Sequence, residues 1–254
     1  MINYIGESKR EKSNSIIRQK LKKQKSIFTL LLLGFPLIFL LFDYGYINSP
    51  EKITGDRMAT CKLITDSGSV GTAFLVSKNG ILLTARHCVD DLANGETVTL
   101  NFDKVKTPGY NNLKATVIYL PLDEKDDFAV LKLVKSVDIK PLKVSGVIED
   151  PSLYNPDVKV IGYPAIVKTQ SIDNTNSVVN YDLEEDSTLF IIDEIFKGYS
   201  GGPVIDKVTG EVIGIVSWKI VESDDKFWNN YLGMSFCEKV QQVFDDPNTS
   251  HIDW

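Results

Sequence analysis

From Met58 onward, the sequence is a succession of short apolar runs separated by turn residues. Val, Ile, Thr and aromatic residues dominate these runs, which include ATCKLI, GTAFLVS, GILLTA, ATVIYL, FAVLKLV, VKVIGY and EVIGIVSW. Asn79-Gly80 and Thr209-Gly210 lie between paired runs, where such dipeptides form hairpin turns. Many short strands without helical periodicity between them predict an all-β barrel or sandwich.

One helical pattern follows the strands. Cys237, Val240 and Val243 recur at helical spacing, which predicts a helix over about residues 237–245. The apolar content of 43% and the charged content of 24% are ordinary for a folded domain. The net charge of -6 gives no support for nucleic-acid binding by the chain as a whole.

The N-terminal part of the chain has a different character. Residues 1–26 are rich in Lys and Arg, and an uncharged apolar run follows from Ile27 to Phe42. A helix over this run is about 24 Å long, and the stretch through Tyr44 and Tyr46 extends it toward the bilayer thickness of about 30 Å. We therefore expect a transmembrane signal anchor over residues 27–47, with the basic side in the cytoplasm.

Two other interpretations of this run compete with an anchor. A cleaved signal peptide needs small residues at its end, whereas this run ends Leu40-Leu41-Phe42-Asp43. A buried core helix has no amphipathic partner in the sequence before it. With an anchor, residues 48–57 form a linker, and the domain at 58–254 lies outside the cytoplasm. Together with the resemblance described below, the anchor leads us to expect a bacterial inner membrane, with the domain facing the periplasm or the cell exterior.

The segment Gly198-Tyr-Ser-Gly-Gly-Pro203 carries the first chemical signal. Its glycines permit a sharp turn that exposes Ser200, and they let the amides of Gly198 and Ser200 point into one small space. Such a space is an oxyanion hole for a tetrahedral intermediate. The competing interpretation is a glycine-rich hairpin between strands.

A nucleophilic serine needs a base, and the chain has only two histidines. His251 lies in the polar C-terminal tail, whereas His87 follows an apolar strand, so His87 is the candidate base. The base needs a carboxylate to orient it, and Asp126-Asp127 opens the apolar run FAVLKL. Asp127 adjoins that run and is the better candidate. Each residue taken alone also has a purely structural interpretation.

Together, these segments resemble the chymotrypsin/trypsin family of serine proteases. The resemblance is carried by segments in the order His, Asp, Ser, namely Thr84-Ala-Arg-His-Cys88, Asp127-Phe-Ala-Val-Leu131, Gly198-Tyr-Ser-Gly-Gly-Pro203, Gly214-Ile-Val-Ser-Trp218 and Gly233-Met-Ser-Phe236. It implies two packed six-stranded antiparallel β-barrels, over about 58–135 and 152–236, with His87, Asp127 and Ser200 in the cleft between them. It also implies a serine endopeptidase that acts on protein or peptide substrates without a metal or an organic cofactor.

The resemblance further suggests residues that contact or support the substrate. Ser217 is similar to the serine that supports the triad aspartate in this family. The backbone of Ser217, Trp218 and Lys219 is similar to the strand that pairs with an extended substrate. Glu194 lies where the family often places the floor of the primary specificity pocket, which favours Lys or Arg in the substrate. Lys219 at the pocket wall would neutralise Glu194, and a surface-facing Glu194 is the other interpretation.

Several departures separate the chain from the animal digestive enzymes. Tyr199 precedes the serine where those enzymes have an aspartate, and no activation site is visible near Met58. The chain therefore resembles the compact bacterial branch, which includes periplasmic quality-control proteases, but without their PDZ domain. The residue immediately before Gly71 is not a cysteine, so the family disulfide to Cys88 is not expected. The three cysteines are either buried apolar residues or contain one disulfide and a free thiol.

The same pattern is also compatible with a different function. A protein that kept this fold but lost turnover, or that stays latent until a partner rebuilds its oxyanion loop, would act as a binding protein at the membrane surface. The intact set of His87, Asp127 and Ser200 argues against lost turnover.

Overall fold

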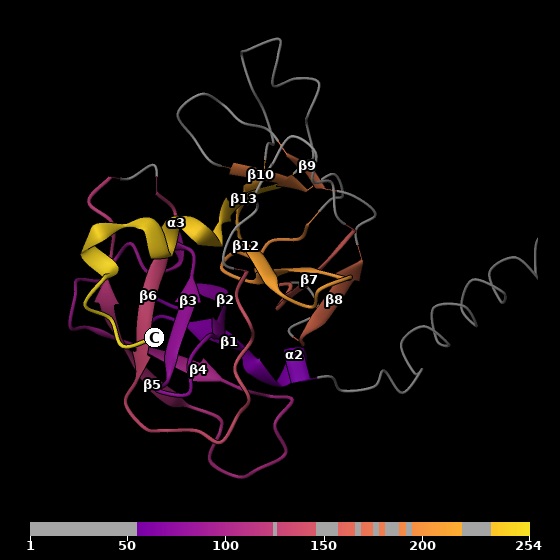
Figure 1. Cartoon of the computed structure of the whole chain (residues 1–254). Coiled ribbons are helices and arrows are strands. Elements are labelled where there is room, and N and C mark those ends of the chain that lie inside the picture. Colours follow the sequence, from indigo (N-terminus) through magenta and orange to yellow (C-terminus); the bar gives the residue numbers. More distant parts are fainter. Residues whose placement is uncertain are drawn as a thin grey trace, which may run out of the picture. The chain divides into compact units, whose positions relative to one another are not determined.

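The computed structural model describes residues 55–123, 126–145, 157–165, 169–174, 178–180, 188–191, 195–219 and 235–254, all of which belong to one unit of the chain (Figure 1). No helix within these ranges has both the length and the apolar character needed to span a membrane. The predicted anchor at 27–47 and Glu194 lie outside the described residues.

Six antiparallel strands in the first half close into a barrel with the order β1-β2-β3-β6-β5-β4. These strands are β1 (Thr60–Ile64), β2 (Val70–Leu75), β3 (Ile81–Thr84), β4 (Thr97–Asn101), β5 (Leu113–Tyr119) and β6 (Ala129–Leu133). Closure by pairing of β1 with β4 removes the open sheet edges. The predicted six-stranded barrel is confirmed for this half. A short helix, α2 (Gly55–Ala59), precedes β1, and a 3₁₀ turn, η1 (Arg86–Cys88), follows β3.

The second half differs from the predicted six-stranded barrel. Its described strands form one seven-stranded sheet, β8-β7-β11-β12-β13-β10-β9. They are β7 (Val158–Gly162), β8 (Ser171–Asn174), β9 (Val178–Asn180), β10 (Thr188–Ile191), β11 (Pro203–Asp206), β12 (Val212–Lys219) and β13 (Ser235–Lys239). Part of the difference comes from β8, a polar strand at one end of the sheet that a search for apolar runs passes over.

The predicted helix over 237–245 is correct only from Val240, because α3 spans Val240–Asp245. Cys237 pairs with Val216 of β12 and with Leu189 of β10, so backbone pairing on both sides keeps this segment extended. Helical spacing of apolar residues therefore placed the start of the helix three residues too early. A last 3₁₀ turn, η3, covers Pro247–Thr249.

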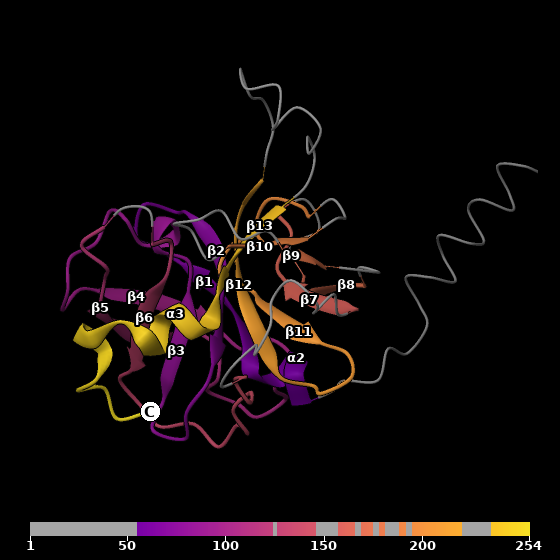
Figure 2. The same cartoon turned by 45° about the horizontal axis from the view of Figure 1, so that its top comes forward.

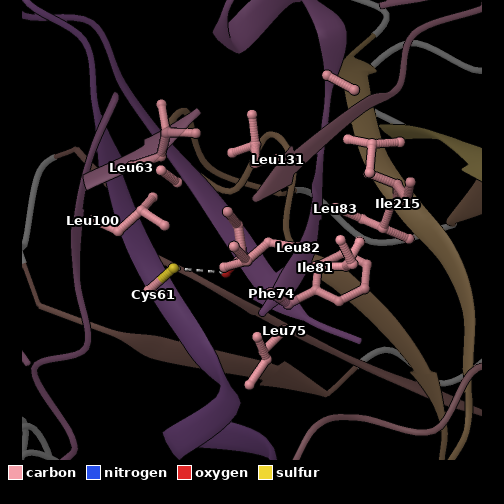
Figure 3. Close-up of a cluster of buried hydrophobic side chains, with 14 of the residues drawn as sticks. Cys61, Leu63, Phe74, Leu75, Ile81, Leu82, Leu83, Leu100, Leu131 and Ile215 are labelled. Carbon is pink, nitrogen blue, oxygen red and sulfur yellow. Dashed lines mark hydrogen bonds between the residues drawn. The ribbon is translucent and has the colours of Figure 1, made fainter. Parts of the chain in front are cut away.

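The larger hydrophobic core fills the first barrel and continues beyond it. Figure 3 shows Leu63, Phe74, Leu82 and Leu131 of the barrel together with Ile215 of β12. Residues of the C-terminal segment also belong to this core, including Val240, Val243 and Ile252. In Figures 1 and 2 α3 lies beside the strands of the first barrel. The chain therefore crosses back after the second sheet and buries apolar residues against its own first half.

All three cysteines are buried and unpaired. The Cys61 thiol donates a hydrogen bond to the Ala73 carbonyl at 3.4 Å (Figure 3). Burial raises the pKa of the Cys61 and Cys237 thiols well above their ordinary value, which keeps both protonated. Both therefore act as small apolar core residues.

Two identical substitutions test whether the barrel core supplies the stability of the domain. Leu82 is 0% exposed in β3, whereas Leu122 is 96% exposed. We expect Leu82→Ala to lower the free energy of unfolding by about 2–5 kcal/mol, because it leaves a cavity in a close-packed core. Leu122→Ala should change it by less than about 0.5 kcal/mol. Urea denaturation of the full chain measures both, and equal effects of the two substitutions would contradict this view of the core.

Candidate active site

His87 lies in the 3₁₀ turn that follows β3, and Asp127 lies just before β6. Because β3 and β6 are antiparallel with Thr84 opposite Ala129, the chain before Ala129 continues alongside the chain after Thr84. The register of two core strands therefore brings His87 and Asp127 together. Both distances to the carboxylate are short: the ring atom Nδ1 is 2.7 Å from Oδ2, and the His87 backbone amide is 2.9 Å from Oδ1.

The Asp127 carboxylate is held by a third donor from the second sheet. The Ser217 hydroxyl on β12 donates to Oδ2 of Asp127, the same oxygen that faces the His87 ring. The Asp127 side chain is 12% exposed, whereas the His87 side chain is 42% exposed. A nearly buried carboxylate is thus bonded on both oxygens, and the ring that it holds presents its other edge toward solvent.

The environment of His87 favours its charged form. Burial of the ring is the largest single effect and disfavours the imidazolium. The hydrogen bonds and charges of Asp127 and Cys88 together outweigh burial and raise the pKa of His87 to about 10. With Nδ1 bonded to Asp127, Nε2 is the ring nitrogen that remains for proton exchange with another group.

Ser200 lies in a tight loop in which two positions, 198 and 201, have room and backbone angles for glycine only. Gly198 has φ +103°, and a Cβ there would lie 2.2 Å from the Tyr163 carbonyl oxygen. Gly201 has φ +82°, and a Cβ there would lie 2.2 Å from the Thr84 hydroxyl oxygen. The backbone of this loop is therefore pressed against both halves of the domain, which explains the glycines on either side of Ser200.

Two peptide groups of this loop have their carbonyls turned into the protein. The Lys197 carbonyl accepts from the Ala165 amide at 2.8 Å, and the Tyr199 carbonyl accepts from the Gly202 amide at 2.7 Å. Because a trans peptide holds N–H opposite to C=O, the amides of Gly198 and Ser200 point the other way. Neither amide donates a hydrogen bond to any residue in the described part of the chain. Two such amides are suited to stabilising an oxyanion.

The Ser200 hydroxyl donates to the Ser217 carbonyl at 3.2 Å. Among the described residues, it makes no hydrogen bond to His87. Ser217 thus contacts Asp127 through its hydroxyl and Ser200 through its carbonyl. The structure therefore gathers His87, Asp127, Ser200 and Ser217 at the junction of the two halves.

Of the residues predicted to contact the substrate, Trp218 and Lys219 lie within the described backbone, and Glu194 does not. Trp218 and Lys219 form the end of β12, where the pairing with β13 shifts register between Val216 and Lys219. On the other side, the pairing of β12 with β11 ends at Ile215. Val216 still exchanges backbone hydrogen bonds with Gly201 and Gly202 on that side, at 2.7 and 2.9 Å. From residue 217 onward, the backbone of β12 has no strand partner on the β11 side within the described residues.

The sequence did not indicate the contribution of Ala165, which acts through its backbone amide and so has no residue-type signature.

The structure corrects the position that was expected to lie opposite Cys88. A Cβ built on Gly71 would lie 2.7 Å from the Cys88 sulfur, so Gly71 itself, and not the residue before it, faces Cys88. Within the described residues, no group of three His, Cys, Asp or Glu side chains is arranged to hold a metal ion.

Comparison with known proteins assigns the fold and the family. The family model for the trypsin-like peptidase domain matches residues 71–215, a range that includes His87, Asp127 and Ser200. The structure of the Rv3671c protease from M. tuberculosis in its active form aligns with a TM-score of 0.54 at 22% identity over 75% of this chain and 79% of that chain. The HtrA-type protease AlgW with a tripeptide aligns with a TM-score of 0.54 at 20% identity over 76% of this chain and 60% of that chain. These two similarities concern the fold.

Two curated relatives are described as DegP-like periplasmic serine endoproteases. The one from Pseudomonas fluorescens is 27% identical over 84% of this chain and 40% of its own length. The one from Halomonas elongata is 31% identical over 70% of this chain and 34% of its own length. The chain therefore matches less than half the length of these relatives. The matched family model spans more than half of the chain, and the chain belongs to the family of trypsin-like peptidase domains.

Proposed function

We propose that this chain is a serine endopeptidase in which Ser200 is the nucleophile, His87 the general base and Asp127 the residue that orients it. The observation that carries the proposal is the set of hydrogen bonds at Asp127. Its carboxylate lies 2.7 Å from Nδ1 of His87 and accepts from the Ser217 hydroxyl, and the Ser217 carbonyl accepts from Ser200. A protein of this family acts on protein or peptide substrates. The proposed reaction is hydrolysis of a peptide bond within such a chain.

The proposed chemistry has two halves. The Ser200 oxygen bonds to the substrate carbonyl carbon while its proton passes to Nε2 of His87, and the amides of Gly198 and Ser200 receive the oxyanion. The C–N bond then breaks, and the leaving amine takes the proton from His87. A water molecule attacks the acyl-enzyme in the same way, and His87 returns a proton to Ser200. The chain's own residues supply every proton transfer.

The end of β12 has no strand partner on the β11 side among the described residues, which gives a substrate a place to bind. An extended peptide can pair with the backbone of residues 217–219 on the side where pairing with β11 has ended. Such a peptide competes with the Ser200 hydroxyl for the Ser217 carbonyl. Release of that hydroxyl allows it to turn toward His87, so substrate binding and assembly of the nucleophile–base pair are coupled.

A latent protein is the second candidate, and two observations favour it. The Ser200 hydroxyl bonds to Ser217 in place of His87, and an imidazole with a pKa of about 10 is protonated at neutral pH. Both describe a resting arrangement in which the base is not ready. An enzyme that leaves this arrangement only with a partner would act as a regulated binding protein until that partner is present.

We further propose that residues 27–47 anchor the chain in a membrane, with 1–26 in the cytoplasm and the peptidase domain outside it. The apolar run and its basic flank support this orientation. The two curated relatives are described as periplasmic, which agrees with a domain outside the cytoplasm.

Labelling with a fluorescent fluorophosphonate tests the proposed nucleophile in the full chain. We expect the parent to be labelled and Ser200→Ala and His87→Ala to lose the label, because the probe needs an activated serine. Ser250→Ala, which changes an exposed serine, is the matched control and should label like the parent. A folded parent that takes no label would overturn constitutive activity and leave the latent protein as the function.

The pH dependence of labelling tests the state of His87. Because His87 accepts a proton only when neutral, and because its pKa is raised from 6.5 to about 10, the labelling rate should keep rising with pH through this range. Asp127→Asn should lower the pKa of His87 and reduce the rate by about 10⁴-fold, since the ring loses the partner that fixes its tautomer. NMR titration follows His87 directly, and His251→Gln assigns the two histidines. A rate that is already constant above pH 7 would contradict the raised pKa.

Membrane extraction tests the anchor. The full chain produced in bacterial cells should stay with the membrane after alkaline carbonate washing, because a spanning helix is released only by detergent. Deletion of residues 1–47 should move the chain to the soluble fraction. Recovery of the full chain in the soluble fraction, or of a mature chain beginning after Phe42, would show that the segment is cleaved or does not anchor.

A further inference from the structure

A buried threonine of the first barrel contacts the Ser200 loop at two points. Thr72 lies on β2 and is 0% exposed. Its hydroxyl donates to the Gly198 carbonyl at 2.8 Å, and its backbone amide donates to the Ser200 carbonyl at 2.8 Å. One residue of the first barrel thus holds carbonyls on both sides of Tyr199, in a loop that belongs to the second half of the chain.

The Thr72 hydroxyl is itself oriented by the second half. It accepts a hydrogen bond from the Tyr163 backbone amide at 3.1 Å, so its single proton is free to point at the Gly198 carbonyl. The Thr72 carbonyl accepts from the Thr84 hydroxyl at 2.7 Å. Because Thr84 ends β3, just before His87, this set of hydrogen bonds connects the histidine segment with the serine loop.

The Gly198 carbonyl belongs to the peptide between the two candidate oxyanion amides. This peptide is joined through the Cα atoms of Gly198 and Tyr199 to the two peptides that carry those amides. A restraint on its carbonyl therefore limits how far the adjacent peptides can shift. Gly198 has no side chain and φ +103°, so steric contacts restrict rotation about the bonds to its Cα less than they would for another residue. The hydrogen bond from Thr72 supplies the constraint that the glycine lacks.

We infer that Thr72 is a positioning residue of the oxyanion loop, whose hydroxyl holds the 198–199 peptide so that the amides of Gly198 and Ser200 stay directed into the active site. Thr72 acts through the loop and does not contact the substrate. The inference rests on the proposed function, because it assigns the role of the loop to that reaction. Without the hydroxyl, a buried carbonyl loses its donor, and the peptide gains by turning to another partner.

The test compares Thr72→Val with Thr72→Ser in the full chain. Valine keeps the shape and the backbone bond to Ser200 but removes the hydroxyl, whereas serine keeps the hydroxyl. We expect Thr72→Val to lower kcat about 10- to 100-fold on a peptide ester with little change in KM, because a misdirected oxyanion amide affects the transition state. Thr72→Ser should retain kcat within about threefold of the parent.

Thr249→Val is the matched control. Thr249 is also 0% exposed, and its hydroxyl donates to the Val243 carbonyl at 2.6 Å, within the C-terminal segment. We expect this variant to lose stability like Thr72→Val but to keep kcat. Unchanged kcat in Thr72→Val, or an equal loss of kcat in Thr249→Val, would overturn the positioning role.

An inactive parent would refute the proposed function, and a second measurement then decides the inference separately. The Tyr199 and Gly202 amides bond to the Phe196 and Tyr199 carbonyls. Slow hydrogen exchange of these two amides in the Ser200→Ala chain therefore reports an ordered loop. Adding Thr72→Val should speed exchange of these two amides at least tenfold relative to the added Thr249→Val. Equal exchange in the two double variants would refute the role of Thr72.

Discussion

The Asp127 carboxylate is the group on which the arrangement of the site depends. A charge that is nearly out of water is costly unless donors surround it. Here the donors are the His87 amide, the His87 ring and the Ser217 hydroxyl, which come from both halves of the domain. The carboxylate therefore has all its donors only when the first barrel and the second sheet are packed together as they are here. The same packing also positions Ser200.

Other buried polar contacts between the halves maintain the same register. Arg57 of α2 donates to the side chain of Gln170 at 2.9 Å, and Gln170 donates back to the Arg57 carbonyl at 2.8 Å. The Tyr163 hydroxyl donates to Asp103 of the first barrel at 2.5 Å. Tyr163 also provides the amide that orients Thr72. Tyr163 therefore takes part both in the contact with Asp103 and in the contacts around the Ser200 loop.

The sequence predicted the parts of this structure that depend on residue type. Alternating apolar runs indicated the strands of the first barrel, and the rarity of histidine left His87 as the candidate base. The register of β3 and β6 explains why Asp127 adjoins His87, and the apolar run after Asp127 was the signal for it. The sequence segments around these residues also indicated the trypsin-like family, which the match of residues 71–215 to the family model confirms.

The parts that were missed depend on backbone contacts and on competition between structures. The polar strand β8 has no apolar signature, and Cys237 lies at helical spacing from Val240 but pairs with two strands. The hydrogen bonds from the Ala165 amide to Lys197 and from the Thr72 hydroxyl to Gly198 depend on how the loop packs, and no local sequence pattern indicates them. Hydrogen bonds between residues more than a hundred positions apart are a property of the assembled domain.

The resting position of the Ser200 hydroxyl follows from the same competition. A neutral hydrogen bond of this kind contributes about 0.5–1.5 kcal/mol, so the bond to the Ser217 carbonyl is a weak restraint. A peptide that pairs along β12 forms several backbone hydrogen bonds at once, which outweighs that single bond. The raised pKa of His87 adds a second restraint in the proposed reaction, because the imidazolium has to release a proton before the ring can accept one from Ser200. In the proposed reaction, the change from the resting arrangement to a reactive one therefore includes both rotation of the Ser200 hydroxyl and proton loss at His87.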